Sequence, residues 1–134
     1  WNLEGKRIAL LGLAFKAGTD DTRLSPSLKL AERLLAEGAR VVGFDPVANE
    51  AARNDLPALE TCTDLYEALD GAHCAVIGTE WPEFSDIDLS RAAKVMKFKI
   101  IVDGRNLLDP EAVSSAGFTY LPTGRPQRGL EGSR

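Results

Sequence analysis

Short apolar runs alternate with more polar, amphipathic segments along this chain, and the alternation predicts its elements of secondary structure. Four runs are almost uninterrupted, which is the pattern of strands buried on both faces of a parallel sheet. Two weaker runs predict shorter strands. The expected strands are 7–12, 40–44, 59–62, 74–78, 99–103 and 118–121.

The segments between these runs carry signals for helices. Ser25 suits an N-cap, and Pro26 suits the first helical position. Leucines and alanines then keep helical spacing until Gly38, which fits the left-handed residue that often follows a helix. Further short helices are expected over 47–54, 65–69, 88–97 and 110–116, with 79–84 left as a loop.

Strands that alternate with helices predict a doubly wound α/β fold. Right-handed crossovers would build a three-layer, Rossmann-like, mostly parallel sheet of five to six strands, covered on both faces. The 134 residues suffice for a single domain. We expect this domain to span 1–121, and we expect the tail over 122–134, which contains proline, glycine and arginine, to be flexible.

Charge and composition narrow the classes of partner and compartment. A net charge of −4 leaves no broad cationic face, so nucleic acid is not an expected partner. Apolar stretches such as 8–15 are far shorter than the ~20 residues of a membrane span, and no signal-peptide pattern opens the chain. We therefore expect a cytoplasmic protein that does not bind membranes.

The residue types that most often bind metals or act as nucleophiles are few. Cys62, Cys74 and the lone His73 form no metal-binding spacing and no catalytic dyad. We expect these three side chains to be packed structural groups. The sequence thus predicts neither a metal site nor a catalytic residue in this chain.

A first candidate site follows the first expected strand. The usual GxGxxG turn is missing there, and a polar loop of about a dozen residues precedes the helix, a length that usually indicates function. Lys16 and Arg23 in this loop suit a phosphate near the helix N-terminus. Alternatively, these cations pair on the surface with Asp20 and Asp21.

A second candidate site is the Asp103-Gly-Arg-Asn106 turn after the expected strand over 99–103. Arg105 can form two parallel bonds to phosphate or sugar oxygens, although a surface ion pair is the alternative. Asp45 resembles the acid that holds a ribose in dinucleotide folds, but Asp-Pro also starts turns, and we favour the turn. For Trp81 we favour packing over a place in a pocket.

Four motifs together point to a known family. They are the 12–27 stretch GLAFKAGTDDTRLSPS, the Asp45-Pro46 pair, the 79–84 stretch TEWPEF and the 103–106 turn DGRN. Through them the chain from Gly5 to about Pro122 resembles the C-terminal, nucleotide-sugar-binding domain of the UDP-glucose/GDP-mannose dehydrogenase family, most closely the members that oxidise UDP-glucose. Enzymes of this family use two NAD molecules in succession to oxidise the sugar's primary alcohol to a carboxylate.

The resemblance implies a role for each candidate residue. Phe15 and Lys16 would line the UDP-sugar site, and Arg105 would make a further contact to the nucleotide sugar. Arg23 corresponds to an arginine that reaches across the cleft toward NAD. The loop would be braced by Thr19, Asp20 and Asp21.

The resemblance also implies what lies elsewhere. The family's catalytic cysteine, its glycine-rich NAD loop and its linking helix belong to preceding sequence, and Cys62 and Cys74 do not match the cysteine. The expected partners are therefore a UDP-sugar and an N-terminal NAD-binding domain of the same protein, in a full-length enzyme that forms homo-oligomers. This chain alone would be inactive.

Three other functions stay open at this point. One is a dehydrogenase that acts on another nucleotide sugar, such as GDP-mannose or a UDP-N-acetyl sugar. Another is a stand-alone regulatory module that binds nucleotides. A phosphoacceptor domain, suggested by Asp20 and Asp21, ranks lower because both acids lie well beyond the first expected strand.

Overall fold

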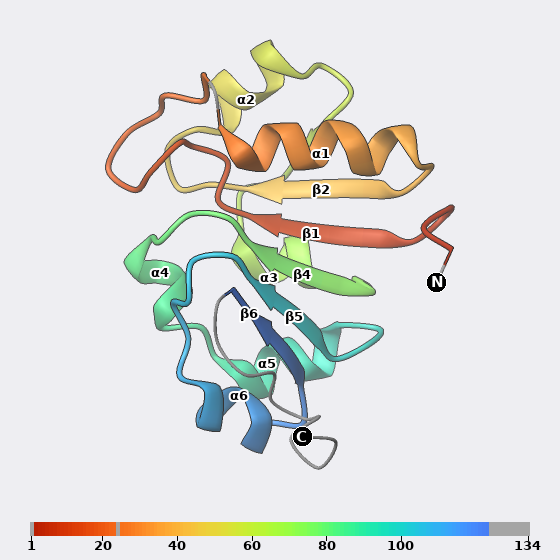
Figure 1. Cartoon of the computed structure of the whole chain (residues 1–134), viewed down its shortest axis with the longest axis vertical. Coiled ribbons are helices and arrows are strands. Elements are labelled where there is room, and N and C mark those ends of the chain that lie inside the picture. Colours follow the sequence, from red (N-terminus) through yellow and green to blue (C-terminus); the bar gives the residue numbers. More distant parts are fainter. Residues whose placement is uncertain (1, 24, 124–134) are drawn as a thin grey trace.

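A six-stranded parallel sheet forms the centre of the protein (Figure 1). The structure is a computed structural model that describes residues 2–23 and 25–123. The strand order is β3-β2-β1-β4-β5-β6, and every neighbouring pair is parallel. The doubly wound fold predicted from the sequence is confirmed. The strands are β1 (Arg7–Leu11), β2 (Arg40–Phe44), β3 (Glu60–Thr61), β4 (Cys74–Ile77), β5 (Ile100–Asp103) and β6 (Thr119–Pro122).

Helices lie on both sides of this sheet and complete three layers. One face packs against α1 and α2, and the opposite face packs against the remaining helices. In Figure 1, α1 runs alongside β2, while α3 is seen partly behind the strands. The helices are α1 (Pro26–Ala36), α2 (Asn49–Asp55), α3 (Leu65–Leu69), α4 (Pro82–Ser85), α5 (Leu89–Val95) and α6 (Pro110–Ser115).

The helix α1 begins and ends where the sequence predicts. The Oγ of Ser25 accepts a hydrogen bond from the backbone N–H of Leu28, and Pro26 occupies the first turn. Leu28 and Ala31 are buried against the sheet. The chain leaves the helix through Gly38, whose φ of +89° lies in the left-handed region.

The helix α4 was not predicted, because its segment was expected to be a loop. Pro82 occupies its first turn, and the side chain of Phe84 is fully buried in the main core cluster. Burial of this one aromatic ring fixes a turn that the local sequence signals only weakly. The last strand also differs, since β6 includes Pro122, which the sequence analysis assigned to the tail. Residues 124–134 of that tail lie outside the described residues.

The two faces of the sheet are not covered equally. The face toward α3, α5 and α6 holds the largest core cluster, including the buried Tyr120. On the other face, α1 and α2 pack over β1, β2 and β3, while Val76, Ile100 and Val102 are only partly buried. Both faces are therefore covered, as the sequence predicts, and the cover is thinner over β4 and β5 on the side of α1.

Among residues 2–23 and 25–123, the structure contains no helix with the length and apolar character needed to cross a bilayer.

Candidate functional site

Three loops meet at the carboxyl edge of the sheet, after β1, β4 and β5. Figure 1 shows them on the same side of the molecule. The strand order reverses between β1 and β4, so the loops after these two strands flank the switch point, and the loop after β5 is next to them. Ligands of doubly wound proteins bind at this position.

The loop after β1 packs tightly against the loop after β4. Gly12 has a φ of +97°, and a Cβ added there would lie 2.5 Å from the Cβ of Thr79. The hydroxyl of Thr79 donates to the carbonyl oxygen of Ala14 at 3.0 Å. Only glycine allows this approach, so the first candidate loop is fixed to its neighbour where it leaves the strand.

A buried carboxylate at the end of β2 fixes the same loop. The Oδ2 atom of Asp45 accepts hydrogen bonds from the backbone N–H groups of Leu13 and Ala14, at 2.8 and 3.1 Å. Its Oδ1 atom accepts from the N–H groups of Val47 and Ala48, both at 2.9 Å. The turn predicted for this aspartate is confirmed. Because its oxygens are already bonded to the protein, this carboxylate is not available to a ribose.

Phe15 and Lys16 lie directly beyond this anchored segment, and both are exposed. Phe15 is 48% exposed, while its backbone N–H donates to the carbonyl oxygen of Asp21 at 2.8 Å. Lys16 forms no salt bridge within the described ranges 2–23 and 25–123, so for this residue the alternative of a surface ion pair is not observed. An exposed ring beside an exposed ammonium suits a ligand that carries both a flat or apolar face and a phosphate.

Arg23 is paired with Asp21 on the surface. Its Nε and Nη2 atoms lie 3.1 and 3.2 Å from the two carboxylate oxygens. The side-chain hydrogen bond raises the pKa of Arg23 and lowers the pKa of Asp21. The hydroxyl of Thr19 accepts from the N–H of Asp21, so two of the three bracing residues do brace the loop. The Arg23 side chain remains 85% exposed.

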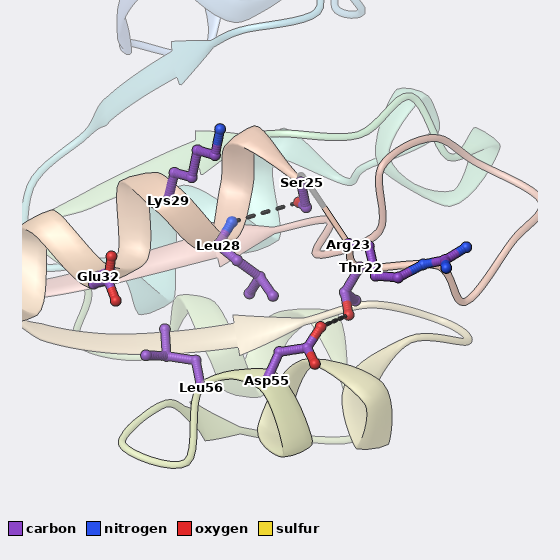
Figure 2. Close-up of a pocket in the computed structure, with 8 residues that line it drawn as sticks. All are labelled: Thr22, Arg23, Ser25, Leu28, Lys29, Glu32, Asp55 and Leu56. Carbon is purple, nitrogen blue, oxygen red and sulfur yellow. Dashed lines mark hydrogen bonds between the residues drawn. The ribbon is translucent and has the colours of Figure 1, made fainter.

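A hollow of about 400 Å³ lies beside Arg23, between α1 and α2 (Figure 2). The hydroxyl of Thr22 donates to the carboxylate of Asp55, which ties the loop to the end of α2. Figure 2 shows the side chain of Arg23 reaching outward, away from this bond. The hollow is lined by Thr22, Arg23, Ser25, Leu28, Lys29, Glu32, Asp55 and Leu56.

A second buried carboxylate, that of Asp103 at the end of β5, fixes the other candidate loop. Its Oδ1 atom accepts from the N–H of Arg105 at 3.0 Å, and its Oδ2 atom accepts from the N–H groups of Leu107 and Leu108. The hydroxyl of Tyr120 donates to the same Oδ2 atom at 2.6 Å. The sequence analysis named the arginine of this turn but missed its anchor. An aspartate at the end of a strand and directly before glycine is the signal that could have indicated it.

Arg105 forms a salt bridge to Glu80, with its Nη2 atom 2.5 Å from Oε2. The alternative of a surface ion pair is therefore observed for Arg105. The side chains remain 36% and 38% exposed, so a ligand can reach the arginine. Arg105 also lines a hollow of about 260 Å³ at the switch point, together with Leu10, Pro26, Ser27, Leu30, Val76, Ile77, Gly78 and Gly104.

The cysteines and the histidine are packed groups, as the sequence predicts. Burial raises the pKa of Cys74 to about 11 and also raises the pKa of Cys62, so both thiols are disfavoured as nucleophiles at neutral pH. The Nδ1 atom of His73 accepts from the N–H of Arg7 at 3.0 Å, and its ring packs edge-on against Phe98. Within the described ranges, no cluster of three or more His, Cys, Asp or Glu side chains could hold a metal ion.

A doubly wound fold with Lys16 and Arg105 on loops at this edge of the sheet is typical of an α/β domain that binds nucleotides. The sequence model of the UDP-glucose/GDP-mannose dehydrogenase family, UDP binding domain, matches residues 9–110, and the chain belongs to this family. The resemblance found in the sequence motifs is thereby confirmed.

Curated relatives agree with this assignment. The chain is 42% identical over 132 residues to a UDP-glucose 6-dehydrogenase of Pseudomonas aeruginosa, covering 94% of this chain and 29% of that protein. It is 38% identical over 134 residues to the UDP-glucose 6-dehydrogenase TuaD of Bacillus subtilis, covering 98% of this chain and 29% of the relative. The chain thus spans less than a third of the length of these enzymes.

Solved structures of related dehydrogenases contain the same fold. A UDP-D-ManNAc dehydrogenase from Pyrococcus horikoshii superposes with a TM-score of 0.76 at 36% identity, over 92% of this chain and 27% of that one. An NDP-N-acetyl-D-galactosaminuronic acid dehydrogenase from Methanosarcina mazei gives a TM-score of 0.80 at 31% identity, over 92% and 26%. This chain therefore corresponds to one domain of each enzyme.

Proposed function

We propose that this chain is the UDP-sugar-binding domain of an NAD-dependent UDP-glucose 6-dehydrogenase, which oxidises UDP-glucose to UDP-glucuronate. The observation that carries the proposal is the match of residues 9–110 to the family's UDP binding domain, with the exposed Lys16 and Arg105 on loops that flank the switch point. The 42% identity to a UDP-glucose 6-dehydrogenase favours glucose as the sugar.

The residues of the two loops contact different parts of the nucleotide sugar. Lys16 and Arg105 approach the diphosphate from separate loops and neutralise its charge through charge-assisted hydrogen bonds. Phe15 packs its exposed ring against a flat or apolar face of the nucleotide sugar. Asp45 and Asp103 hold the backbone of the loops and do not touch the ligand.

NAD contacts this chain through Arg23. One exposed guanidinium beside a hollow can make a single contact to a dinucleotide. It does not form a complete binding site for the cofactor. NAD supplies the hydride acceptor, and the remainder of its site belongs to the N-terminal NAD-binding domain of the same protein. That part of the protein also supplies the catalytic thiol and the contacts of a homo-oligomer, so this chain by itself is inactive.

The protein acts in the cytoplasm, where its two free cysteines stay reduced. The other nucleotide sugars remain the second candidate, because similar structures include dehydrogenases of N-acetyl sugars. A stand-alone nucleotide-binding module is the third.

The test is NAD reduction by the full-length protein that contains this domain. With UDP-glucose, two NADH should form for each UDP-glucuronate, and the isolated 134-residue chain should remain at background. NADH formation with a UDP-N-acetyl sugar but not with UDP-glucose would show that the sugar is wrong. Turnover by the isolated chain would contradict the proposed division of labour.

A further inference from the structure

Three consecutive residues after β4 contact both candidate loops. The Thr79 hydroxyl donates to the carbonyl oxygen of Ala14, directly before Phe15 and Lys16. The carboxylate of Glu80 pairs with the guanidinium of Arg105 on the other loop.

Trp81 is linked to the first loop indirectly, through a carboxylate oxygen that also accepts hydrogen bonds from that loop. Its Nε1 atom donates at 3.1 Å to the Oδ2 atom of Asp45, the same oxygen that binds the N–H groups of Leu13 and Ala14. Thr79 therefore binds the first loop directly, and Trp81 is linked to that loop through Asp45. Glu80 binds the other loop through Arg105.

The segment is held firmly in the core. Thr79 is fully buried against Gly12, and Trp81 packs against the main hydrophobic cluster. The chain then enters α4, whose Phe84 is also fully buried. Glu80 thus projects from a rigid base, and its side chain is 38% exposed, while the Oε2 atom that faces Arg105 is buried.

We propose that Glu80 is a positioning residue for nucleotide-sugar binding, which holds the guanidinium of Arg105 at a fixed place relative to Lys16. This inference rests on the proposed function. The salt bridge uses Nη2 of Arg105, and among the described residues the other donors of the planar fork have no partner, so they can bind phosphate oxygens. The backbone of Arg105 is already held by Asp103. Glu80 therefore restricts the conformations of the Arg105 side chain.

Glu80 has two opposing effects on the affinity for a diphosphate. Their relative sizes decide whether the loss of Glu80 weakens or strengthens binding. Its negative charge repels a diphosphate, but the pair is more than one third exposed, so solvent and salt screen this repulsion. An arginine that is not held in advance must be immobilised when the ligand binds. That ordering weakens binding by roughly two- to tenfold. We therefore expect the loss of Glu80 to weaken binding.

The experiment is a calorimetric titration of UDP and of uridine into the full-length protein and its Glu80→Gln variant. UDP should bind roughly two- to tenfold more weakly, whereas uridine, which lacks phosphate, should bind as it does to the parent. In an Arg105→Ala background, Glu80→Gln should have no further effect. The matched control is Glu83→Gln, which removes the same charge from an exposed position on α4.

Unchanged or tighter UDP binding by Glu80→Gln would overturn the inference. Equal weakening of UDP and uridine would also overturn it, since a general loss of structure affects both. Thermal melts check folding, and Glu80→Asp, which keeps the charge on a shorter side chain, should bind UDP more tightly than Glu80→Gln. A parent protein that binds no UDP would instead contradict the proposed function.

Discussion

Two buried aspartates, Asp45 and Asp103, prepare the candidate site without facing a ligand. Each stands at the carboxyl end of a parallel strand and accepts hydrogen bonds from the backbone of a loop that carries a candidate residue. A buried carboxylate is stable only when its oxygens are bonded in this way. The turn at Asp45 could be predicted from Asp-Pro. Its bonds to residues 32 and 31 positions earlier could not, because they depend on the pairing of β1 with β2.

Asp45→Asn should destabilise the protein. The amide would place its NH₂ group against backbone N–H groups that now donate to a carboxylate oxygen. We expect a loss of about 2–4 kcal/mol in the free energy of unfolding, measured by urea denaturation. The control Asp20→Asn changes an exposed carboxylate and should stay within about 0.5 kcal/mol of the parent. Equal stabilities of both variants would contradict the role of Asp45.

His73 should make the stability depend on pH. Burial lowers the pKa of its imidazole from 6.5, and Lys97 and Lys6 lower the pKa further. The unfolded chain then binds a proton more readily than the folded one, so the free energy of unfolding should fall as pH drops through 6.5. Protonation of Nδ1 would also break its bond from Arg7.

Thermal melts between about pH 7.5 and 5.5, above the range where most carboxylates titrate, should show this loss for the parent protein. The variant His73→Asn keeps a hydrogen-bond acceptor but cannot be protonated, so its melting temperature should vary less over the same interval. Parallel curves for the two proteins would exclude His73 as the cause.

The elements that the sequence predicts well are those with local signals. α1 has an N-cap, a proline in its first turn and a glycine after its end, and the buried strands have continuous apolar runs. β3 is shorter than predicted because it lies at the sheet edge, where only Glu60 and Thr61 pair with β2. α4 was missed because it depends on the burial of Phe84, and Glu80 was missed because its partner lies on another loop.

The close contact between the β1 loop and the β4 loop can be tested by a substitution at Gly12. Gly12→Ala places a methyl group against Thr79 at a positive φ, which combines overpacking with backbone strain. The free energy of unfolding should fall by about 2–4 kcal/mol. Gly18→Ala is the matched control, since Gly18 has a φ of +87° but open space around it, and we expect about 1–2 kcal/mol. Both variants introduce backbone strain at a positive φ, but only Gly12→Ala also places a methyl group against Thr79. An equal loss of stability in denaturation experiments would contradict the tight contact with Thr79.

The candidate cations of the described structure lie in two regions. Lys16 and Arg105 lie on loops at the switch point, whereas Arg23 lies beside α1 and α2 and reaches outward (Figure 2). The chain spans less than a third of the length of these curated relatives. The fold class and the candidate loops could be predicted from the sequence, but the contacts between those loops could not, because they join residues far apart in the chain.

Arg23 should affect NAD rather than UDP in the full-length enzyme. Its side chain is 85% exposed and pairs only with a residue of its own loop in the described structure, so Arg23→Ala should leave the fold intact. We expect the KM for NAD to rise about tenfold, as for the loss of one charge-assisted contact, with UDP binding unchanged. Steady-state kinetics and a UDP titration measure the two effects. Weaker UDP binding with an unchanged NAD response would reverse the assignment.

The most direct test of the proposed nucleotide-sugar site is a UDP-glucose titration of the full-length protein and its Lys16→Ala, Arg105→Ala and double variants, with folding checked by thermal melts. Each charge-assisted bond contributes roughly 1.5–3 kcal/mol, so each single variant should bind about ten- to over a hundredfold more weakly. Coupling in the double variant would indicate a shared phosphate, and additivity would indicate two separate contacts to the same ligand. If both single variants bind UDP-glucose as tightly as the parent, the site is wrong and Arg105 is only the surface partner of Glu80.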